Sequence, residues 1–324
     1  MRAVTIAGDP PRLALTDRAA PDRPGECRVR VRTAGICGTD LELLRGYAGF
    51  RGVPGHEFAG VVEEAPPADA ALIGRRVVGE INVGCGACRF CRLGVREHCD
   101  DRTVLGIRDR DGAFAEYLTL PATNLHALPD ALDDVQAVFV EPTAAACRIL
   151  EQVAVGPSTR AAVVGDGRMG LLTAQVLRST GAAVVVVGKH DEKLAVARRL
   201  GLDSTRVEDA RRRLRAFDLV VDATGHPSGL DLALEMTRPR GTVVMKSTYH
   251  GSIAWTPWRS IVDEIALIGS RCGPFAPAIA LLASGRVDVG PMVAEVRPLQ
   301  EFEAAFASAR HALKVVLQVT EAAP

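Results

Sequence analysis

The sequence predicts an α/β protein of two domains, a β-rich domain followed by a doubly wound parallel sheet. Three observations lead to this prediction. The chain has 324 residues, which is more than one compact core usually holds. Residues 1 to about 140 are short alternating segments between frequent Gly and Pro, which is typical of strands joined by long loops. From residue 141 to about 275, apolar strands alternate with amphipathic helices, which indicates a parallel sheet covered on both faces.

The individual elements follow the hydrophobic pattern. Residues 28–32 alternate strictly, as a half-buried strand does. Short strands are expected at 60–62 and 76–79. In the second region, strands are expected at 161–164, 183–187, 218–222 and 242–245, and helices at 171–179 and 192–200. Residues 301–312 form an amphipathic helix, and the strand at 314–319 is expected to rejoin the first domain. We therefore predict one domain over residues 1–141 and 277–324, and a second over residues 142–276.

Charge and composition exclude several classes of partner. The chain has 39 Lys and Arg against 39 Asp and Glu, so it lacks the overall positive field that drives binding to nucleic acids or acidic membranes. No apolar run is long enough to span a membrane, and the first residues lack the pattern of a signal peptide. We expect a cytoplasmic enzyme with a small-molecule substrate, in which the eight cysteines are not disulfide-bonded.

Four cysteines crowd into one loop. Cys85, Cys88, Cys91 and Cys99 have the spacing C-x2-C-x2-C-x7-C. C-x2-C spacing lets two sulfurs reach one ion from a tight turn, and zinc prefers four such soft ligands at tetrahedral angles. Because protein fills all four positions, the sequence predicts a structural zinc here.

A second, open metal site is predicted in two loops of the first domain. Cys37 and His56 are suitable ligands for a catalytic zinc, which takes about three protein ligands and keeps one position for water or substrate. Asp40 is a candidate to accept a hydrogen bond from the second nitrogen of His56. Spacing alone does not identify the third ligand.

A glycine-rich turn predicts a cofactor site in the second domain. Gly165, Gly167 and Gly170 form G-x-G-x-x-G, with Arg168 and Met169 between the last two glycines. The turn lies between a predicted strand and helix, where its glycines allow a tight turn and close approach to a pyrophosphate. A Rossmann-like methyltransferase has a similar loop, so the loop alone does not identify the cofactor.

The end of the next strand indicates which dinucleotide is bound. A cofactor with a free 2′-hydroxyl needs an acidic acceptor there, and this chain has Gly188, Lys189 and His190 instead. Glycine leaves room for a 2′-phosphate, Lys189 offers it a positive charge, and His190 is a second donor. We therefore predict that NADP(H) is preferred, with NAD(H) as the alternative.

Together these motifs resemble the zinc-dependent medium-chain alcohol dehydrogenase family, in its polyol, sugar and threonine dehydrogenase branch. The resemblance runs along nearly the whole chain. It rests on the A-G-I-C-G-T-D loop at 34–40, G-H-E at 55–57, the four-cysteine loop, V-E-P at 140–142, the G-x-G-x-x-G turn, and D-A-T-G at 222–225. It implies a GroES-like catalytic domain and a Rossmann cofactor domain.

The resemblance also implies roles for single residues. Cys37 and His56 would hold the catalytic zinc. Glu141 matches the third ligand of the polyol and threonine branch, and Glu57 is the other candidate for that position. Thr39 matches the hydroxyl that passes the substrate proton outward.

In the second domain, Thr224 and Gly225 would lie near the nicotinamide ribose. The family has one catalytic and one structural zinc per chain, and its members are usually homo-oligomers, either dimers or tetramers. One departure is Glu42, which stands where many members have a relay histidine.

The resulting prediction is a zinc-dependent dehydrogenase that transfers a hydride between NADP(H) or NAD(H) and a secondary alcohol, polyol or sugar-like substrate. Two alternatives remain. One is a quinone or enoyl reductase of the zinc-free type, which would lack the ligand residues named above. The other is a catalytically silent NADPH-binding redox regulator. About two zinc ions per chain would favour the first prediction over both.

Overall fold

The computed structural model describes residues 1–248 and 257–321. By their contacts they fall into two units, Met1–Glu141 with Val293–Pro324, and Pro142–Met292. The sequence prediction places the first boundary at the same residue and the second after residue 276. The segment 277–292 belongs to the second unit because Gln175 of that unit exchanges two hydrogen bonds with the backbone of Asp288, at 2.8 and 3.0 Å.

The first unit is built mainly of strands. Its strands are β1 (Arg2–Ala7), β2 (Arg12–Asp17), β3 (Cys27–Gly35), β4 (Glu57–Glu64), β5 (Arg76–Gly79), β6 (Asn82–Val83), β7 (Thr103–Val104), β8 (Tyr117–Leu120), β9 (Leu125–Ala127), β16 (Val293–Pro298) and β17 (Lys314–Gln318). Its helices are α1 (Gly38–Leu43), α2 (Arg89–Arg92), α3 (Asp134–Ala137) and α11 (Phe302–Ala309), with 3-10 turns at Tyr47–Gly49, Pro67–Leu72, Arg96–His98, Ala122–Asn124 and Leu299–Glu301. Helix α4 (Val140–Gln152) begins at the boundary of this unit.

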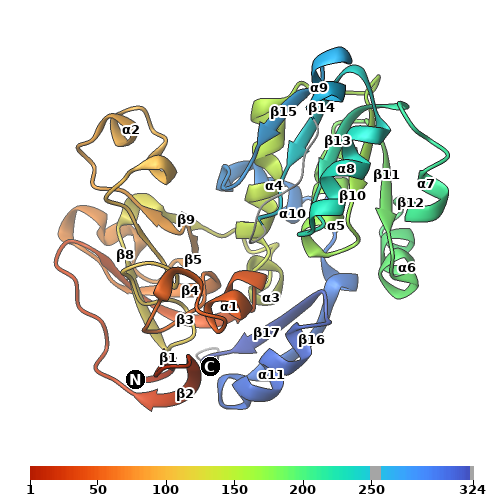
Figure 1. Ribbon diagram of the computed structural model, residues 1–324. Coiled ribbons are helices and arrows are strands. Elements are labelled where there is room, and N and C mark those ends of the chain that lie inside the picture. Colours follow the sequence, from red (N-terminus) through yellow and green to blue (C-terminus); the bar gives the residue numbers. More distant parts are fainter. Residues whose placement is uncertain (249–256, 322–324) are drawn as a thin grey trace. The chain divides into compact units, whose positions relative to one another are not determined.

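The second unit alternates strands with helices (Figure 1). Its elements are β10 (Arg160–Val164), α5 (Arg168–Arg178), β11 (Ala183–Gly188), α6 (Asp191–Arg199), β12 (Asp203–Arg206), α7 (Val207–Ala210), β13 (Phe217–Asp222), α8 (Pro227–Met236), β14 (Thr237–Met245), α9 (Trp258–Val262), β15 (Ala266–Gly269), α10 (Phe275–Ala283) and a 3-10 turn at Gly290–Met292.

The main sheet of the first unit has the order β16-β17-β3-β4-β5-β9, with β8 also paired to β3. Alternate residues of β3 from Cys27 to Val31 are buried, as the sequence pattern predicts, and the burial becomes continuous from Thr33 to Gly35. The register places Gly35 of β3 opposite Glu57 of β4. It also places Gly35 opposite Val316 of β17. The C-terminal strand thus lies beside the strand that leads into the predicted zinc ligands.

The sheet of the second unit is parallel throughout, in the order β12-β11-β10-β13-β14-β15. Strand order reverses at β10, and right-handed crossovers then place α5 and α6 on one face and α8 on the other. The buried residues Val163, Val164, Val220 and Val221 form apolar runs without alternation, as strands covered on both faces require. This is the doubly wound order that binds dinucleotides at the carboxyl ends of its strands, and it confirms the predicted fold class.

The described residues contain no helix long and apolar enough to cross a lipid bilayer.

Candidate metal centres and cofactor loop

The four-cysteine loop brings its sulfurs to one point. The Sγ atoms of Cys85, Cys88, Cys91 and Cys99 all lie within 4.8 Å of one another. Cys88 is the N-cap of α2, and its Sγ accepts a hydrogen bond from the backbone N–H of Cys91 at 3.5 Å. The Sγ atoms of Cys85 and Cys99 each accept one at 3.4 Å. Backbone N–H groups aimed at sulfur favour thiolates, and four thiolates in this arrangement fit a zinc ion.

Glycine lets this loop close around the sulfurs. A Cβ on Gly84 would lie 2.6 Å from Sγ of Cys91, and Gly86 has φ of +77°, so neither position takes a side chain without strain. Hydrogen bonds from the backbone of Ala87 and Cys88 lower the pKa of Cys85 to about 7. Burial raises the pKa of Cys91 to about 11. The remaining cysteines lie outside this group, and Cys27 and Cys147 are buried.

A second donor group forms where β3 ends and β4 begins. Cys37 is the N-cap of α1, His56 directly precedes β4, and Glu57 is its first residue. Pairing of Gly35 with Glu57 brings these segments together. One ligand atom from each of Cys37, His56 and Glu57 lies within 4.8 Å of the others. Thiol, imidazole and carboxylate together form a donor set that suits a catalytic zinc.

Asp40 ties the two loops of this group together. Its Oδ2 accepts from the backbone N–H of Cys37 at 2.7 Å, and its Oδ1 accepts from that of Gly55 at 3.2 Å. Oδ1 also lies 3.4 Å from Nδ1 of His56, a distance at which the two atoms attract without an aligned hydrogen bond. Burial alone would lower the pKa of His56, but Asp40 and Cys37 raise it well above its usual value. The same negative potential favours a cation among these side chains.

Glu57 has a partner that the sequence did not reveal. Lys314, the first residue of β17, is fully buried, and its Nζ donates to Oε2 of Glu57. Nζ also lies 3.5 Å from the carbonyl oxygen of Ile36 and 5.4 Å from the centre of the Phe139 ring. Oε1 of Glu57 is buried and has no hydrogen-bond partner within the part of the chain that the structure describes. The only sequence signal for Lys314 is a lysine at the start of an otherwise apolar strand.

Thr39 and Glu141, the other two predicted residues of this site, lie on two different helices. Thr39 lies in the first turn of α1, with Oγ1 3.8 Å from Sγ of Cys37. Glu141 lies in the first turn of α4 and is partly buried. Among the described residues, the donor group that includes Cys37 contains Glu57 and not Glu141. Glu42, at the position of the relay histidine, pairs with Arg45 at 2.6 Å.

The glycine-rich turn follows β10 and leads into α5. Gly165 has φ of +126°, and a Cβ there would lie 2.6 Å from the carbonyl oxygen of Ala223. A Cβ on Gly170 would lie 1.9 Å from the carbonyl oxygen of Gly165. Gly167 is the N-cap of α5 and faces open space. The backbone at the start of α5 is therefore free to approach a pyrophosphate.

Asp166, inside this turn, holds the end of the neighbouring strand. Its Oδ2 accepts from the backbone N–H groups of Lys189 at 2.7 Å and His190 at 2.8 Å. Its Oδ1 lies 3.0 Å from Nδ1 of His190. The side chains of Lys189 and His190 are exposed directly after β11, which ends at Gly188.

The remaining predicted cofactor residues start α5 or follow β13. Arg168 and Met169 are the first two residues of α5. Oγ1 of Thr224 donates to Oδ1 of Asp222 at 2.7 Å, and Gly225 has φ of +69°. Burial raises the pKa of Asp222, although the bonds from Thr224 oppose this.

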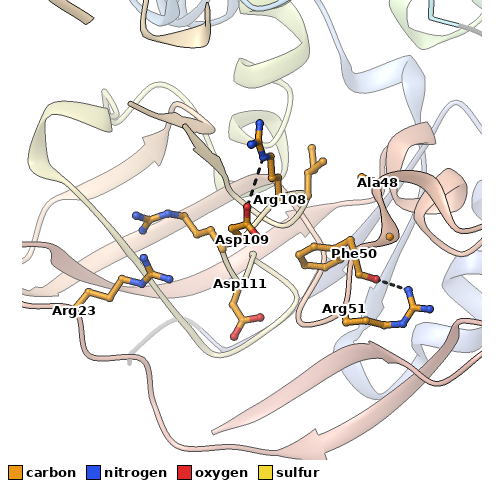
Figure 2. A pocket seen from close by; sticks show the side chains of 10 residues that line it. Arg23, Ala48, Phe50, Arg51, Arg108, Asp109 and Asp111 are labelled. Carbon is orange, nitrogen blue, oxygen red and sulfur yellow. Dashed lines mark hydrogen bonds and ion pairs between the residues drawn. The ribbon is translucent and has the colours of Figure 1, made fainter. Parts of the chain in front are cut away.

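A cavity of about 550 Å³ lies elsewhere in the first unit (Figure 2). Arg23 and the segments 48–51 and 107–111 line it. Its carboxylates are paired with arginines, since Asp109 lies 3.5 Å from Arg108 and Asp111 lies 3.0 Å from Arg18. It contains none of the predicted site residues.

Comparison with known proteins gives matches over both units. The family model described as alcohol dehydrogenase GroES-like domain matches residues 23–130, and the zinc-binding dehydrogenase model matches residues 169–284. The chain is 33% identical to an L-threonine 3-dehydrogenase of Streptomyces avermitilis, over 95% of this chain and 96% of that one. It is 30% identical to D-arabinitol dehydrogenase 1 of Uromyces fabae, over 90% of each chain.

Two solved structures share the whole fold. One, described as a short chain alcohol dehydrogenase of Escherichia coli CFT073 complexed with NADH, has a TM-score of 0.91 at 28% identity, over 98% of this chain and 99% of that chain. The other, a zinc-binding dehydrogenase of Sinorhizobium meliloti bound to NADP, has a TM-score of 0.90 at 27% identity over the same shares. These matches confirm the resemblance that the motifs predict: the chain belongs to the zinc-dependent medium-chain alcohol dehydrogenase family and is an oxidoreductase acting on alcohols.

Proposed function

We propose that this chain binds one catalytic and one structural zinc and transfers a hydride between a nicotinamide dinucleotide and a secondary alcohol, polyol or sugar-like substrate. The observation that carries the proposal is the group formed by Cys37, His56 and Glu57, whose ligand atoms lie within 4.8 Å of one another. When bound, zinc supplies Lewis-acid polarisation of the alcohol oxygen, and the nicotinamide supplies the hydride acceptor.

The protein's own residues position the reactants. Cys37 and His56 hold the metal, with either Glu57 or Glu141 as the third ligand. Asp40 fixes the loop of Cys37 through its backbone N–H. Thr39, beside Cys37, passes the substrate proton outward through its hydroxyl.

In the second unit, the backbone around Gly167 takes the pyrophosphate, and Thr224 and Gly225 contact the nicotinamide ribose. The substrate class is supported by relatives named for alcohols of this kind, one of them for D-arabinitol.

For the cofactor, we propose a preference for NADP(H), with NAD(H) as the alternative. The exposed Lys189, directly after the end of β11, offers a positive charge to a 2′-phosphate, whereas the space that the sequence predicts beside Gly188 is filled by the carboxylate of Asp166. The Lys189→Ala variant is expected to weaken NADPH binding far more than NADH binding. Equal losses for both cofactors would contradict this role.

The decisive experiment combines metal analysis with a substrate panel. The purified chain is expected to contain about two zinc ions and to change the nicotinamide absorbance with some of the polyols, sugars and secondary alcohols offered with each cofactor. One zinc that is lost only when the four-cysteine loop is mutated would refute the proposal. It would favour the catalytically silent regulator instead. Activity with quinones or enoyl substrates in the absence of zinc would favour the zinc-free reductase.

We also propose a homo-oligomer, either a dimer or a tetramer, because members of this family usually assemble. Light scattering coupled to size exclusion measures the mass directly. The mass of one chain, 34.4 kDa, would contradict the proposal.

A further inference from the structure

The acidic residue that usually ends the second strand of a dinucleotide-binding sheet is missing from its ordinary place here. That residue accepts a hydrogen bond from the ribose 2′-hydroxyl, and this chain has Gly188 at the end of β11. A Cβ on Gly188 would lie 2.4 Å from Oδ2 of Asp166. The carboxylate of Asp166 therefore fills the space in which a side chain at position 188 would begin.

Asp166 also occupies the backbone donors of this turn. The N–H groups of Lys189 and His190 both donate to its Oδ2, at 2.7 and 2.8 Å. Successive N–H groups of a turn that point to one side form a natural binding site for an anion. A 2′-phosphate at this turn would have to compete with the carboxylate for both donors.

The carboxylate is ionised and well anchored. The side chain of Asp166 is only 8% exposed. Burial alone would raise its pKa, but the hydrogen bonds from His190 and Lys189 lower it. Oδ1 also lies 3.0 Å from Nδ1 of His190, so this carboxylate engages one of the two side chains that would otherwise contact a phosphate.

Phosphate and hydroxyl respond to this carboxylate in opposite ways. An ionised carboxylate has about four lone-pair sites. The two backbone N–H groups use those of Oδ2, and Nδ1 of His190 lies nearest to Oδ1, at 3.0 Å against 3.1 Å from Oδ2, so a lone pair of Oδ1 is left for a ribose hydroxyl. A 2′-phosphate has no hydrogen to donate when it is fully ionised, and its negative charge is repelled.

We propose that Asp166 is a specificity-determining residue of the cofactor site, which supplies from the glycine-rich turn the acidic acceptor that β11 lacks and counteracts the attraction of Lys189 for a 2′-phosphate. This inference rests on the proposed function in one respect, namely that the chain binds a nicotinamide dinucleotide.

The test compares binding of NADH and NADPH by fluorescence titration in the wild type and in Asp166→Asn. Asparagine preserves the shape of the side chain at position 166 and removes its charge. Its carbonyl oxygen accepts from both backbone N–H groups, and its amide takes the place of the oxygen that faces Nδ1 of His190. The ratio of the dissociation constant of NADPH to that of NADH is expected to fall by roughly tenfold, because one close negative charge is removed.

The same ratio is measured with 2′,5′-ADP and 5′-AMP, which lack the nicotinamide. This pair reports on the adenosine end alone, independently of the metal centre and of hydride transfer. A similar fall of roughly tenfold is expected.

Asp191→Asn is the matched control. It removes the same charge one residue beyond His190, from a side chain that is 71% exposed and paired with Arg206. Because solvent screens an exposed charge, the ratio is expected to change by less than about twofold.

A transfer of the carboxylate gives a second, independent test. Asp166→Gly alone is expected to lower the ratio as Asp166→Asn does. The double variant Asp166→Gly with Gly188→Asp returns the acid to the strand end and is expected to restore the wild-type ratio. This pair carries the test if Asp166→Asn does not fold.

Several outcomes would overturn the inference. An unchanged ratio would mean that the carboxylate does not sense the 2′ position. A higher ratio would mean that Asp166 instead arranges Lys189 and His190 to receive a phosphate. If the wild type binds neither dinucleotide, the proposed function fails, which is a result distinct from equal changes in both constants.

Discussion

The two candidate metal centres of the first unit are assembled in different ways. The four cysteines come from one loop of fifteen residues, Cys85 to Cys99, so chain-local turns bring their sulfurs together. The second centre joins Cys37 to His56 and Glu57 through the pairing of β3 with β4, and its carboxylate contacts Lys314, 257 residues away in the sequence. The first centre therefore needs only its loop, whereas the second needs the folded sheet.

The two centres also differ in the chemistry that their ligands allow. At the cysteine loop, four protein sulfurs would fill every position around a zinc ion, which would leave no place for a substrate. In the second centre His56 and Glu57 are buried and Cys37 is partly buried, and Oε1 of Glu57 has no hydrogen-bond partner among the described residues. Loss of one centre should therefore remove the reaction, and loss of the other should mainly weaken the fold.

The largest expected effect is on catalysis. Cys37→Ser is expected to lower kcat by about 10³-fold or more, since Lewis-acid stabilisation is worth several kcal/mol. Zinc analysis should show the loss of one ion while the ion at the cysteine loop remains. Cys272→Ser, which changes a cysteine outside both groups, serves as the control and should keep both ions. Full activity of Cys37→Ser would remove the distinction between the two centres.

The next largest effect is expected on the free energy of unfolding, from the buried ion pair of Lys314 and Glu57. Lys314→Met leaves the Glu57 carboxylate buried without its cation, which typically costs about 3–5 kcal/mol. Urea unfolding in the presence of a chelator measures this cost without a contribution from zinc. The charge-preserving variant Lys314→Arg should cost less, and combining Lys314→Met with Glu57→Gln should cost less than the sum of the single changes. A loss below about 1 kcal/mol for Lys314→Met would show that the pair is not required.

Breaking the cysteine loop is expected to affect stability more than chemistry. Cys88→Ser should release one zinc and lower the free energy of unfolding by roughly 3 kcal/mol, within the range that loss of a structural metal produces. The melting temperature would fall by roughly 6–12 °C. The second zinc should remain bound. Loss of both ions together would mean that the two centres are coupled.

The smallest effect is expected from the buried ion pair of Arg110 and Glu26. Arg110 donates to Glu26 at 2.7 and 2.8 Å and to Thr103, near the end of the cysteine loop. Burial alone would raise the pKa of Glu26, but Arg110 lowers it. A depressed pKa means that the stabilisation is present above the unfolded value of about 4.3 and is lost as the pH falls through the folded value.

Glu26→Gln should therefore cost about 2 kcal/mol at pH 7, because the side chains of Arg110 and Glu26 are only 4% and 13% exposed and charged hydrogen bonds are worth about 1.5–3 kcal/mol. The difference from the wild type should shrink below about pH 4. Urea unfolding at pH 7 and pH 3.5 compares the two chains. A difference that stays constant with pH would exclude the ion pair as its source.

The contrast between a site formed within one loop and a site formed by distant strands also explains how much the sequence could predict. The metal site of the cysteine loop was predictable because the spacing of its four cysteines within one loop is enough to bring their sulfurs together. The parallel sheet was predictable because its central strands, such as Val184–Val187, are apolar runs, whereas β12, with the polar sequence Asp-Ser-Thr-Arg, was not predicted. The glycine-rich turn was predictable because it lies directly between a predicted strand and a predicted helix.

What the sequence could not reveal are pairings of distant residues. Lys314 meets Glu57 only through the register of β17 with β3. Asp166 meets His190 only where two parallel strands end side by side. The choice between Glu57 and Glu141 as the third ligand likewise depends on three-dimensional distance and not on spacing.

The position of β17 has a consequence for protein synthesis. A ribosome makes the first unit up to Glu141, then the entire cofactor-binding unit, and only afterwards the strand that begins with Lys314. Until that strand emerges, the carboxylate of Glu57 lacks the cation of Lys314, and the end of β3 from Thr33 to Gly35 lacks its β17 partner. We expect the nascent first unit to stay open, with Glu57 accessible to water, while the cofactor-binding unit folds ahead of it. Folding order would then reverse the order of synthesis.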